Sequence, residues 1–559
     1  MPKTSKAAKL AHARPHKPRT SIDHALIVPS ADSISPSRFA KLYFKLKRVK
    51  GAIVAIAGVG AVASGLVGYY TTYKVVANTQ IISSATASAN SQMIDSKSIA
   101  VLPFVNMSGD KKQEYLSDGI SEELRSQLSK IHALRVIARN SSFSFKGKDI
   151  GISEIAKKLK VAHVIEGSIR KSGNKIRINA QLIRAADSSQ LWSETYERDL
   201  ADIFAVQDEI SAAVVRQLKI QILGMTPKAK AIDPRAFAFF LQSGQLVRQR
   251  SSDAYTQAIA LLQKALVIEP SYEKAWVQLS YVYMDQADIG LRPIAEGYRL
   301  SREAANKALA INPDSASAYA LLGQIALAYD SDLTVAAAQM KRALTLEPDN
   351  VFVLGNVASL ALTLGLADQA IAFSEKVLSM DPLSSGIHAT LGSDYLANND
   401  LDESIASYRT ALSLSQGFIG AHANIGDAFI AKGKLQEALA EIQSEPDESW
   451  RLIGLSMVWY ALGDKIKSNA ALSELIKKYE KESAYNIAYV YAFRGDADRA
   501  FEWLNKAVSF QDAGLSVIIR QAQFANIRND PRWLPFLRKI GKAPEQIAAI
   551  KFDVKLPSH

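Results

Sequence analysis

Residues 308–348 read ALAINPDSASAYALLGQIALAYDSDLTVAAAQMKRALTLEP, and the pattern within them decides the fold. An Ala-Leu pair, two further residues, a polar residue and a proline stand at each end of this stretch, 35 residues apart. The pattern recurs with its proline at Pro270, Pro313, Pro348 and, with Val377 in place of the alanine, Pro382. A further copy begins at Ala411-Leu412 and lacks the proline. Because proline cannot continue a helix, each copy predicts the end of one helix and the start of the next.

A glycine follows an aliphatic residue between these marks, at Gly323, Gly392 and Gly426. A residue without a side chain lets two paired helices approach closely. The spacing and the glycines resemble the tetratricopeptide repeat, a helix–turn–helix unit of about 34 residues. The resemblance implies an all-α superhelical solenoid over 233–541, with about eight helix pairs and a cap at 524–541. Residues 542–559 are expected to form a C-terminal tail.

A different pattern precedes the repeats, in residues 98–222. Short apolar or alternating runs predict strands, and runs with apolar residues on one helical face predict helices. We expect strands at 98–104, 134–138, 163–170, 175–184 and 192–196, and helices at 117–130, 152–159 and 202–221. Ser172-Gly173-Asn174 predicts a hairpin turn. The pattern therefore indicates an α/β domain with two or three layers.

This region resembles the TolB-like domain. The phrases that carry the resemblance are IAVLPFVNMSGD (99–110), YLSDGISEEL (115–124), LRVIARNSSFSFKGK (134–148), VIEGSIRKSGNKIRINAQLI (164–183) and LWSETYERDLADIFAVQDEI (191–210). Such domains accompany tetratricopeptide repeats in many bacterial membrane proteins, so the resemblance implies a binding module outside the cytoplasm. In that family a cyclase domain or a winged-helix DNA-binding domain commonly precedes one membrane helix, whereas only fifty residues precede the predicted helix here.

The stretch Gly51–Tyr73, GAIVAIAGVGAVASGLVGYYTTY, contains no charge. A helix of this length would be roughly 34 Å long, enough to cross the hydrocarbon core of a bilayer. Basic residues crowd its N-terminal side and tyrosines its C-terminal side, so the positive-inside rule places residues 1–50 in the cytoplasm. The bulk of the chain would then be periplasmic, anchored in a bacterial inner membrane. Small residues at Gly60, Ser64 and Gly68 would allow a homodimer through this helix.

Two other readings of this segment compete with the anchor. A buried soluble helix rarely extends so far without a polar face. A cleaved signal peptide would need a shorter basic lead and a shorter apolar run, although small residues near Ala89 offer cleavage sites. We expect an uncleaved transmembrane helix at 51–73, followed by a linker at 74–97.

The net charge of +12 belongs almost entirely to the N-terminal tail. Residues 1–50 hold twelve Lys and Arg against two acids, and the remaining 509 residues hold 55 bases against 53 acids. A nucleic-acid-binding module would need a concentrated basic surface, so no nucleic acid partner is expected. The tail has too few apolar residues to fold alone and is expected to be disordered. There is no cysteine, which excludes disulfides and thiolate chemistry.

No residue constellation predicts catalysis, a metal site or a cofactor. His163 and Glu166 lie three apart on a predicted strand and would point to opposite faces. Ser108-Gly109-Asp110 and Ser117-Asp118-Gly119 suit turns and caps better than nucleophiles. Asp400-x-Asp402-Glu403 lacks the glycine and the distal glutamate of a calcium loop. Aromatic residues on first helices, Trp276, Tyr319 and Tyr395, are expected in the core.

The sequence thus predicts a non-enzymatic, membrane-anchored scaffold that binds a protein or peptide partner on the concave face of its repeats. One alternative is a signalling protein that relays a periplasmic signal to a separate cytoplasmic partner. A second is a secreted soluble peptide binder.

Overall fold

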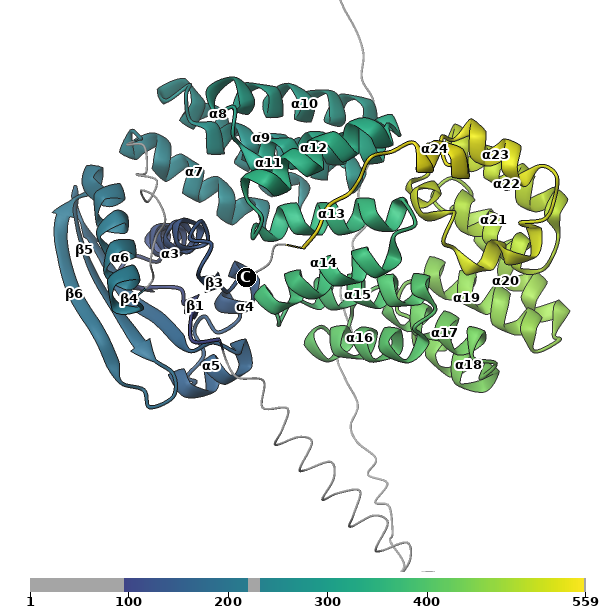
Figure 1. Ribbon diagram of the computed structural model, residues 1–559, viewed down its shortest axis with the longest axis horizontal. Helices are drawn as coiled ribbons and strands as arrows, with labels where there is room; N and C mark the ends of the chain where they lie inside the picture. Colours follow the sequence, from purple (N-terminus) through teal and green to yellow (C-terminus); the bar gives the residue numbers. More distant parts are fainter. Residues whose placement is uncertain (1–94, 220–231, 557–559) are drawn as a thin grey trace, which may run out of the picture. The chain divides into compact units, whose positions relative to one another are not determined.

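The computed structural model describes residues 95–219 and 232–556 (Figure 1). The predicted tail at 1–50, the predicted membrane helix at 51–73 and its dimer residues Gly60, Ser64 and Gly68 lie outside the described residues, as does most of the predicted linker. Within 95–219 and 232–556, no helix has both the length and the apolar character needed to cross a bilayer.

The N-terminal described region is an α/β domain built on a mixed sheet in the order β3-β1-β4-β5-β6, with β2 paired to β4. Its strands are β1 (Ser98–Val101), β2 (Val105–Asn106), β3 (Arg135–Val136), β4 (His163–Ser172), β5 (Lys175–Arg184) and β6 (Gln190–Asp199). Strand β1 pairs in parallel with β3 and β4, and β4, β5 and β6 pair antiparallel. The predicted hairpin turn is confirmed, because Gly173 adopts a φ of +59° between β4 and β5.

Helices cover both faces of the β1 side of the sheet (Figure 1). They are α3 (Glu114–Leu128), α4 (Arg139–Phe143), α5 (Ile152–Leu159) and α6 (Ile203–Gln217). Ile99 and Val101 pack into the same core as α3 and α6, whereas Ala100 and Leu102 pack with α5. Alternate residues of a strand point to opposite faces, so this continuous apolar run reflects burial on both sides.

The structure differs from the predicted elements at several places in this domain: the strand expected at 98–104 ends at Val101, and the short strand β2 was not predicted. Helix α3 begins at Glu114, so Ser117-Asp118-Gly119 lies inside the helix and not in a turn before it. The strand expected at 134–138 shrinks to Arg135–Val136, and the unpredicted helix α4 follows it. One backbone amide in the first turn of α4, that of Ser141, donates to a side chain far away in the sequence, which no local pattern could reveal.

The C-terminal region is a solenoid of eight antiparallel helix pairs within the described residues. The first four pairs are α7 (Pro234–Val247) with α8 (Ser252–Ile268), α9 (Glu273–Asp288) with α10 (Ile294–Ile311), α11 (Ala316–Ile325) with α12 (Leu333–Leu346), and α13 (Val351–Thr363) with α14 (Ala367–Met380). The next four are α15 (Ser385–Asn398) with α16 (Leu401–Leu414), α17 (Ala421–Ala431) with α18 (Leu435–Gln443), α19 (Glu448–Ala461) with α20 (Lys465–Tyr479), and α21 (Ala484–Phe493) with α22 (Ala497–Ser509).

The glycines inside the repeats have the predicted role. A Cβ added at Gly323 would lie 2.8 Å from Met340, and one at Gly392 would lie 2.8 Å from Tyr408. At Gly426 it would lie 2.4 Å from Ile442. In each case the neighbour belongs to the second helix of the same pair, so the missing side chain lets the two helices pack closely.

The chain after α22 folds back onto earlier repeats. It contains η4 (Ala513–Val517), η5 (Ala522–Ile527), α23 (Trp533–Lys539) and α24 (Pro544–Ala548). Phe524, Trp533 and Phe536 join the core formed by α21 and α22. The expected C-terminal tail, 542–559, is packed against earlier repeats as far as Val554 (Figure 1). Phe552 and Val554 are buried in the core of α12, α13 and α14.

A candidate ligand cavity between the α/β domain and the repeats

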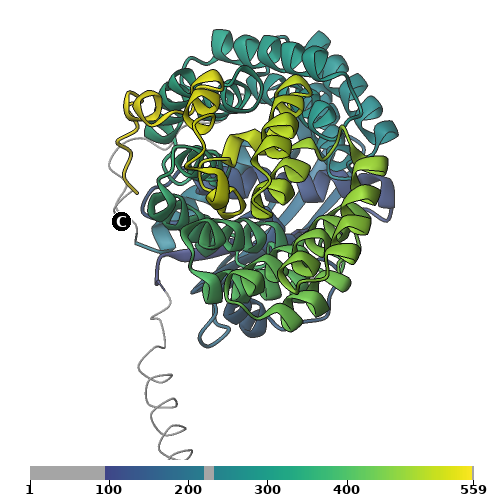
Figure 2. The ribbon, with the colours of Figure 1, turned by 90° about the vertical axis from the view of Figure 1, so that its right-hand side faces the viewer.

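A cavity of about 1480 Å³ lies between the α/β domain, the first helices of the early repeats and the C-terminal segment. Its walls come from α3 and α4, from α7, α9, α11 and α13, and from η4 with the turn after α23. In Figure 2 the yellow C-terminal elements lie inside the curve of the helix pairs, where η4 contacts α13. The cavity therefore uses the inner helices of the solenoid and is narrowed by the end of the same chain.

Two of the contacts between the α/β domain and the repeats lie at the edge of this cavity. At the first, Gly119 of α3 faces Leu241 of α7, and a Cβ on Gly119 would lie 2.5 Å from Leu241 Cδ2. At the second, Asp381 after α14 accepts hydrogen bonds from the backbone N (3.0 Å) and Oγ (2.6 Å) of Ser141. Asn140 Nδ2 donates to the other oxygen of Asp381 at 3.1 Å. The domain thus contacts the first repeat and the boundary between the fourth and fifth.

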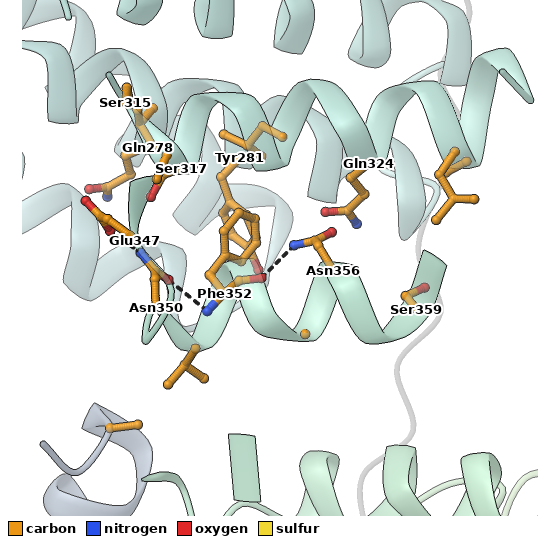
Figure 3. Close-up of a pocket in the computed structure, with 18 of the residues that line it drawn as sticks. Gln278, Tyr281, Ser315, Ser317, Gln324, Glu347, Asn350, Phe352, Asn356 and Ser359 are labelled. Carbon is orange, nitrogen blue, oxygen red and sulfur yellow. Dashed lines mark hydrogen bonds between the residues drawn. The ribbon is translucent and has the colours of Figure 1, made fainter. Parts of the chain in front are cut away.

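Side chains from three inner helices point toward one another across the cavity (Figure 3). Gln278 and Tyr281 come from α9, Gln324 from α11, and Phe352 and Asn356 from α13. The rings of Tyr281 and Phe352 meet edge to face with their centroids 6.4 Å apart. An aromatic pair is thus flanked by amides, a combination that suits a ligand with both apolar and hydrogen-bonding groups.

The amides retain hydrogen-bonding capacity. Gln278 Nε2 donates to Ser243 Oγ at 3.1 Å. Figure 3 shows the bond by which Asn356 Nδ2 donates to the Phe352 carbonyl, at 2.8 Å. Both amide oxygens remain without a donor among residues 95–219 and 232–556, and the Gln324 amide makes no hydrogen bond there. An amide side chain carries two hydrogen-bond donors and an acceptor oxygen with two lone pairs. This row of amides, Gln278, Gln324 and Asn356, can therefore bind a ligand that is rich in donors and acceptors, such as a peptide backbone.

Charged residues line the wall next to the α/β domain. Arg125 forms an ion pair with Glu122 at 2.9 Å, and Lys274 pairs with Glu123. Arg139 lies farther from its acids, with 3.8 Å between its Nε and Glu122 Oε2. Burial, together with the neighbouring Arg248, lowers the pKa of the Arg139 guanidinium to about 10. Its Nε is buried without a hydrogen-bond acceptor, while Glu122 and Asp118 lie within 4.0 Å of the guanidinium and balance its charge at a distance.

The opposite wall, in the C-terminal segment, carries Lys542 and Asp512. Asp512 accepts hydrogen bonds from the backbone N of Tyr485 and of Gly514, each at 2.9 Å. Burial raises the pKa of the Asp512 carboxyl despite these bonds. Lys542 is 6% exposed, and its Nζ donates to the carbonyl of Ser516 at 3.1 Å.

The residues singled out from sequence lie elsewhere. Trp276 donates its ring N–H to the Pro270 carbonyl, Tyr319 packs against the core of α11 to α14, and Tyr395 bonds Glu375. None of them lines the cavity. The residues that do line the cavity are amides and aromatics on the first helices α9, α11 and α13. The sequence contains them, but it does not show which face of each helix turns toward the cavity.

The candidate sites for chemistry also resolve into structural roles. His163 Nδ1 on β4 is buried without a partner, and burial lowers the pKa of this imidazole. Glu166 accepts a hydrogen bond from Gln181 across the sheet at 2.5 Å. Asp110 caps the short helix η1 (Lys111–Gln113) by accepting a hydrogen bond from the Lys112 backbone N, as predicted for a cap residue. Across 95–219 and 232–556, no group of three or more acidic or histidine side chains is placed to hold a metal ion.

Three family models match parts of the chain. The model described as HilA/YgeH-like transcriptional regulator, second domain, matches residues 95–213. One tetratricopeptide repeat model matches residues 390–450, and another matches 353–382 and 482–513. The tetratricopeptide repeats are therefore confirmed, whereas the α/β domain is similar to the second domain of a regulator and is not matched as TolB-like.

Among curated proteins, the chain is similar to Putative adenylate cyclase 3 of Rhizobium meliloti (strain 1021), with 42% identity over 189 residues. The match covers 33% of this chain and 32% of the relative, so the chain spans about a third of that relative's length.

Solved structures with similar helix pairs include PilF of Pseudomonas aeruginosa, at 17% identity and a TM-score of 0.31, with 37% of this chain and 92% of that chain covered. The human IFIT1 dimer with m7Gppp-AAAA is similar at 14% identity and a TM-score of 0.37, with 55% of this chain and 80% of that chain covered.

Proposed function

We propose that this chain is a non-enzymatic, membrane-anchored scaffold whose cavity binds an extended segment of a protein partner. The observation that carries the proposal is the row of amides around the Tyr281–Phe352 pair, on the inner helices α9, α11 and α13 of the solenoid. Solenoids of helical repeats present extended concave binding surfaces of this kind. An extended peptide offers a backbone donor and acceptor at every residue, which matches the unused amide groups of Gln278, Gln324 and Asn356.

Site-specific photo-cross-linking tests the binding site in the full chain. A benzophenone amino acid replaces Gln324 in the cavity or, as the matched control, Gln436, an exposed glutamine of α18 outside the cavity. We expect a defined protein adduct from position 324 only, and its loss when Tyr281→Ala removes one ring of the pair. Equal adducts from both positions, or an adduct that persists in Tyr281→Ala, would contradict binding in the cavity.

The anchor and the periplasmic location belong to the same proposal and are supported by the uncharged stretch 51–73 with its basic flank. A TolB-like α/β module outside the cytoplasm fits this arrangement. Alkaline phosphatase fused after His559 should be active and β-galactosidase inactive, because the former folds only outside the cytoplasm. The reverse pattern would reject the location while leaving the cavity proposal intact.

Association through the membrane helix is a separate part of the proposal, supported by the spacing of Gly60, Ser64 and Gly68. Small residues at this spacing let two helices pack closely, so Gly60→Leu should abolish dimerisation in a genetic reporter of helix association. Gly58→Leu is the control, because Gly58 lies outside that row.

A second candidate, a relay of external signals, is favoured by the similarity to a putative adenylate cyclase and by the regulator-domain match at 95–213. It requires a cytoplasmic partner for residues 1–50. Deletion of residues 2–36, upstream of the basic cluster at 38–50, should then abolish signalling without lowering the amount of protein in the membrane. An unchanged phenotype would leave the scaffold as the function.

A further inference from the structure

Lys542 occupies an unusual position for a charged residue. It follows Gly541, whose φ of +72° ends α23, and its backbone N donates to the Leu537 carbonyl at 2.8 Å. This turn directs the side chain into the wall of the cavity, where only 6% of the residue stays exposed. Lysine is almost never buried to this degree without a partner.

No acidic partner compensates this charge. Within 95–219 and 232–556, no carboxylate oxygen lies within 4.0 Å of Lys542 Nζ, whose hydrogen bond goes to the neutral carbonyl of Ser516. Asp512 on the same wall is engaged by the backbone amides of Tyr485 and Gly514. The neighbouring charged residue Lys539 is itself a cation, and its Nζ donates to Asn505 Oδ1 at 2.9 Å. Burial alone lowers the pKa of the Lys542 ammonium to about 8.

A buried ammonium with two unused donors is costly in the empty protein, because its hydration is lost and no anion replaces it. Arg139 on the opposite wall differs, because its guanidinium lies 3.8 Å from Glu122 Oε2 and 4.0 Å from Asp118 Oδ2, although its Nε has no hydrogen-bond acceptor. Both cations line the same cavity of about 1480 Å³. The lining holds eight acidic and seven basic side chains, so the uncompensated positive charge is local to Lys542. An anion bound next to Lys542 Nζ would neutralise it.

We propose that the ligand of this cavity carries an anionic group, a carboxylate or a phosphate, and that Lys542 is its counter-ion. This inference deepens the proposed function. It takes from that proposal only the location of the ligand, which is the same cavity. An acidic protein segment would supply a carboxylate, and a phosphorylated segment would supply a phosphate. Such a group would pair with an ammonium that otherwise destabilises the folded chain.

Thermal unfolding of the full chain in detergent tests this inference. The probes are sodium phosphate and sodium acetate, each compared with sodium chloride at equal ionic strength and at pH 7. In the wild type, the midpoint should rise by about 2–4 °C in at least one of the two anions relative to chloride, because a ligand that binds only the folded state stabilises it. A response to phosphate alone indicates a phosphate-bearing ligand, and a response to acetate alone a carboxylate.

Two variants at this position make the test specific. Lys542→Met keeps the bulk of the side chain and removes the charge, so it should unfold at a higher temperature in chloride and lose the anion response. Lys542→Arg keeps the charge and should keep the response. The inference is overturned if the wild type responds to neither anion, if Lys542→Met responds as the wild type does, or if Lys542→Met is no more stable in chloride. The assay contains no protein partner, so its failure is distinct from a failure of the cross-linking experiment.

Discussion

Asp381 and Ser141 lie 240 residues apart in the sequence and form two hydrogen bonds, from the backbone N and the Oγ of Ser141 to Asp381 Oδ1. Asp381 is the residue before the proline that ends the fourth repeat, and it is 2% exposed. One aspartate therefore ends a repeat and caps α4 of the α/β domain. Through this contact the domain is held against the solenoid at the edge of the cavity.

Replacing Asp381 with alanine should loosen the α/β domain from the repeats. The change removes three hydrogen bonds to a charged acceptor and leaves the donors of Ser141 buried without partners. We expect a loss of roughly 3 kcal/mol in the free energy of unfolding, measured by urea denaturation. Hydrogen exchange should accelerate at residues 139–142.

The control for this prediction is Asp314→Ala, at the corresponding boundary two repeats earlier. The Asp314 side chain is 68% exposed and pairs with Arg342 at the surface, so its loss should cost less than about 1 kcal/mol. Equal losses for the two variants would show that Asp381 has no special role in docking.

Gly119→Ala should push α3 away from α7. The added Cβ would lie 2.5 to 2.8 Å from three side-chain atoms of Leu241, which is buried in the core between them. We expect a destabilisation of about 1–3 kcal/mol from overpacking, measured by thermal or urea unfolding. The double variant with Leu241→Ala should show a coupling energy, because the second change removes the clashing atoms.

Gly355→Ala is the matched control, since Gly355 also lies within a helix but has no atom within 4 Å of an added Cβ. There the alanine should stabilise the protein by about 0.5–1 kcal/mol through the higher helix propensity of alanine. Effects of the same sign at both glycines would contradict the predicted clash.

Phe552→Ala should release the C-terminal segment from the repeats. Phe552 is 7% exposed in the core of α12 to α14, and Gln369 Nε2 donates to the carbonyl of Val554 at 2.5 Å. A cavity in place of a buried phenylalanine costs about 3–5 kcal/mol, if the segment stays in place. If the segment detaches, the free energy of unfolding falls by less, and limited proteolysis should cleave the chain after residue 549.

The control is Lys341→Ala, which removes only the surface ion pair between Lys341 and Asp553. Such exposed pairs contribute little, so neither the stability nor the protease pattern should change noticeably. A protease pattern in Phe552→Ala identical to that of the wild type would show that the segment is held by other contacts.

Asp394→Asn should change how the stability of the protein depends on pH. Burial raises the pKa of the Asp394 carboxyl to about 6, although Ser374 Oγ donates to it at 2.6 Å. Because the folded pKa lies above the unfolded value of about 3.9, folding favours the protonated acid, and its contribution falls as pH rises from about 4 to 6. Asparagine stays neutral and can still accept from Ser374.

The measurement is the difference in unfolding free energy between Asp394→Asn and the wild type, at pH 4 and at pH 7.5. The variant should gain about 1–3 kcal/mol relative to the wild type at pH 7.5 and much less at pH 4. A difference that does not change between the two pH values would mean that Asp394 titrates normally in the folded protein.

Local patterns predicted the elements that depend on local physics. The prolines at Pro313 and Pro348 mark the ends of α10 and α12, and Gly323 allows the approach of Met340. The strand at Ser98–Val101 was evident from its apolar run, and the hairpin from its turn residues. Helix propensity, strand alternation and turn chemistry act over a few residues, so a single sequence displays them.

Elements that depend on distant partners were missed. Helix α4 is capped by Asp381, and the segment through Val554 is held by its burial against α12, α13 and α14 and by the hydrogen bond from Gln369. The cavity lining was missed for the same reason, since the inward face of α9 is defined by where α13 lies.

By itself, therefore, the sequence determined that this chain is an α/β domain followed by tetratricopeptide repeats, because periodicity and helix breaking are encoded within each repeat of about 34 residues. Only the tertiary structure decided that the α/β domain, the early repeats and the C-terminal segment line one cavity, with Arg139 and Lys542 in its walls. The physical reason is that burial and charge compensation are properties of groups brought together in space, and those groups are hundreds of residues apart along the chain.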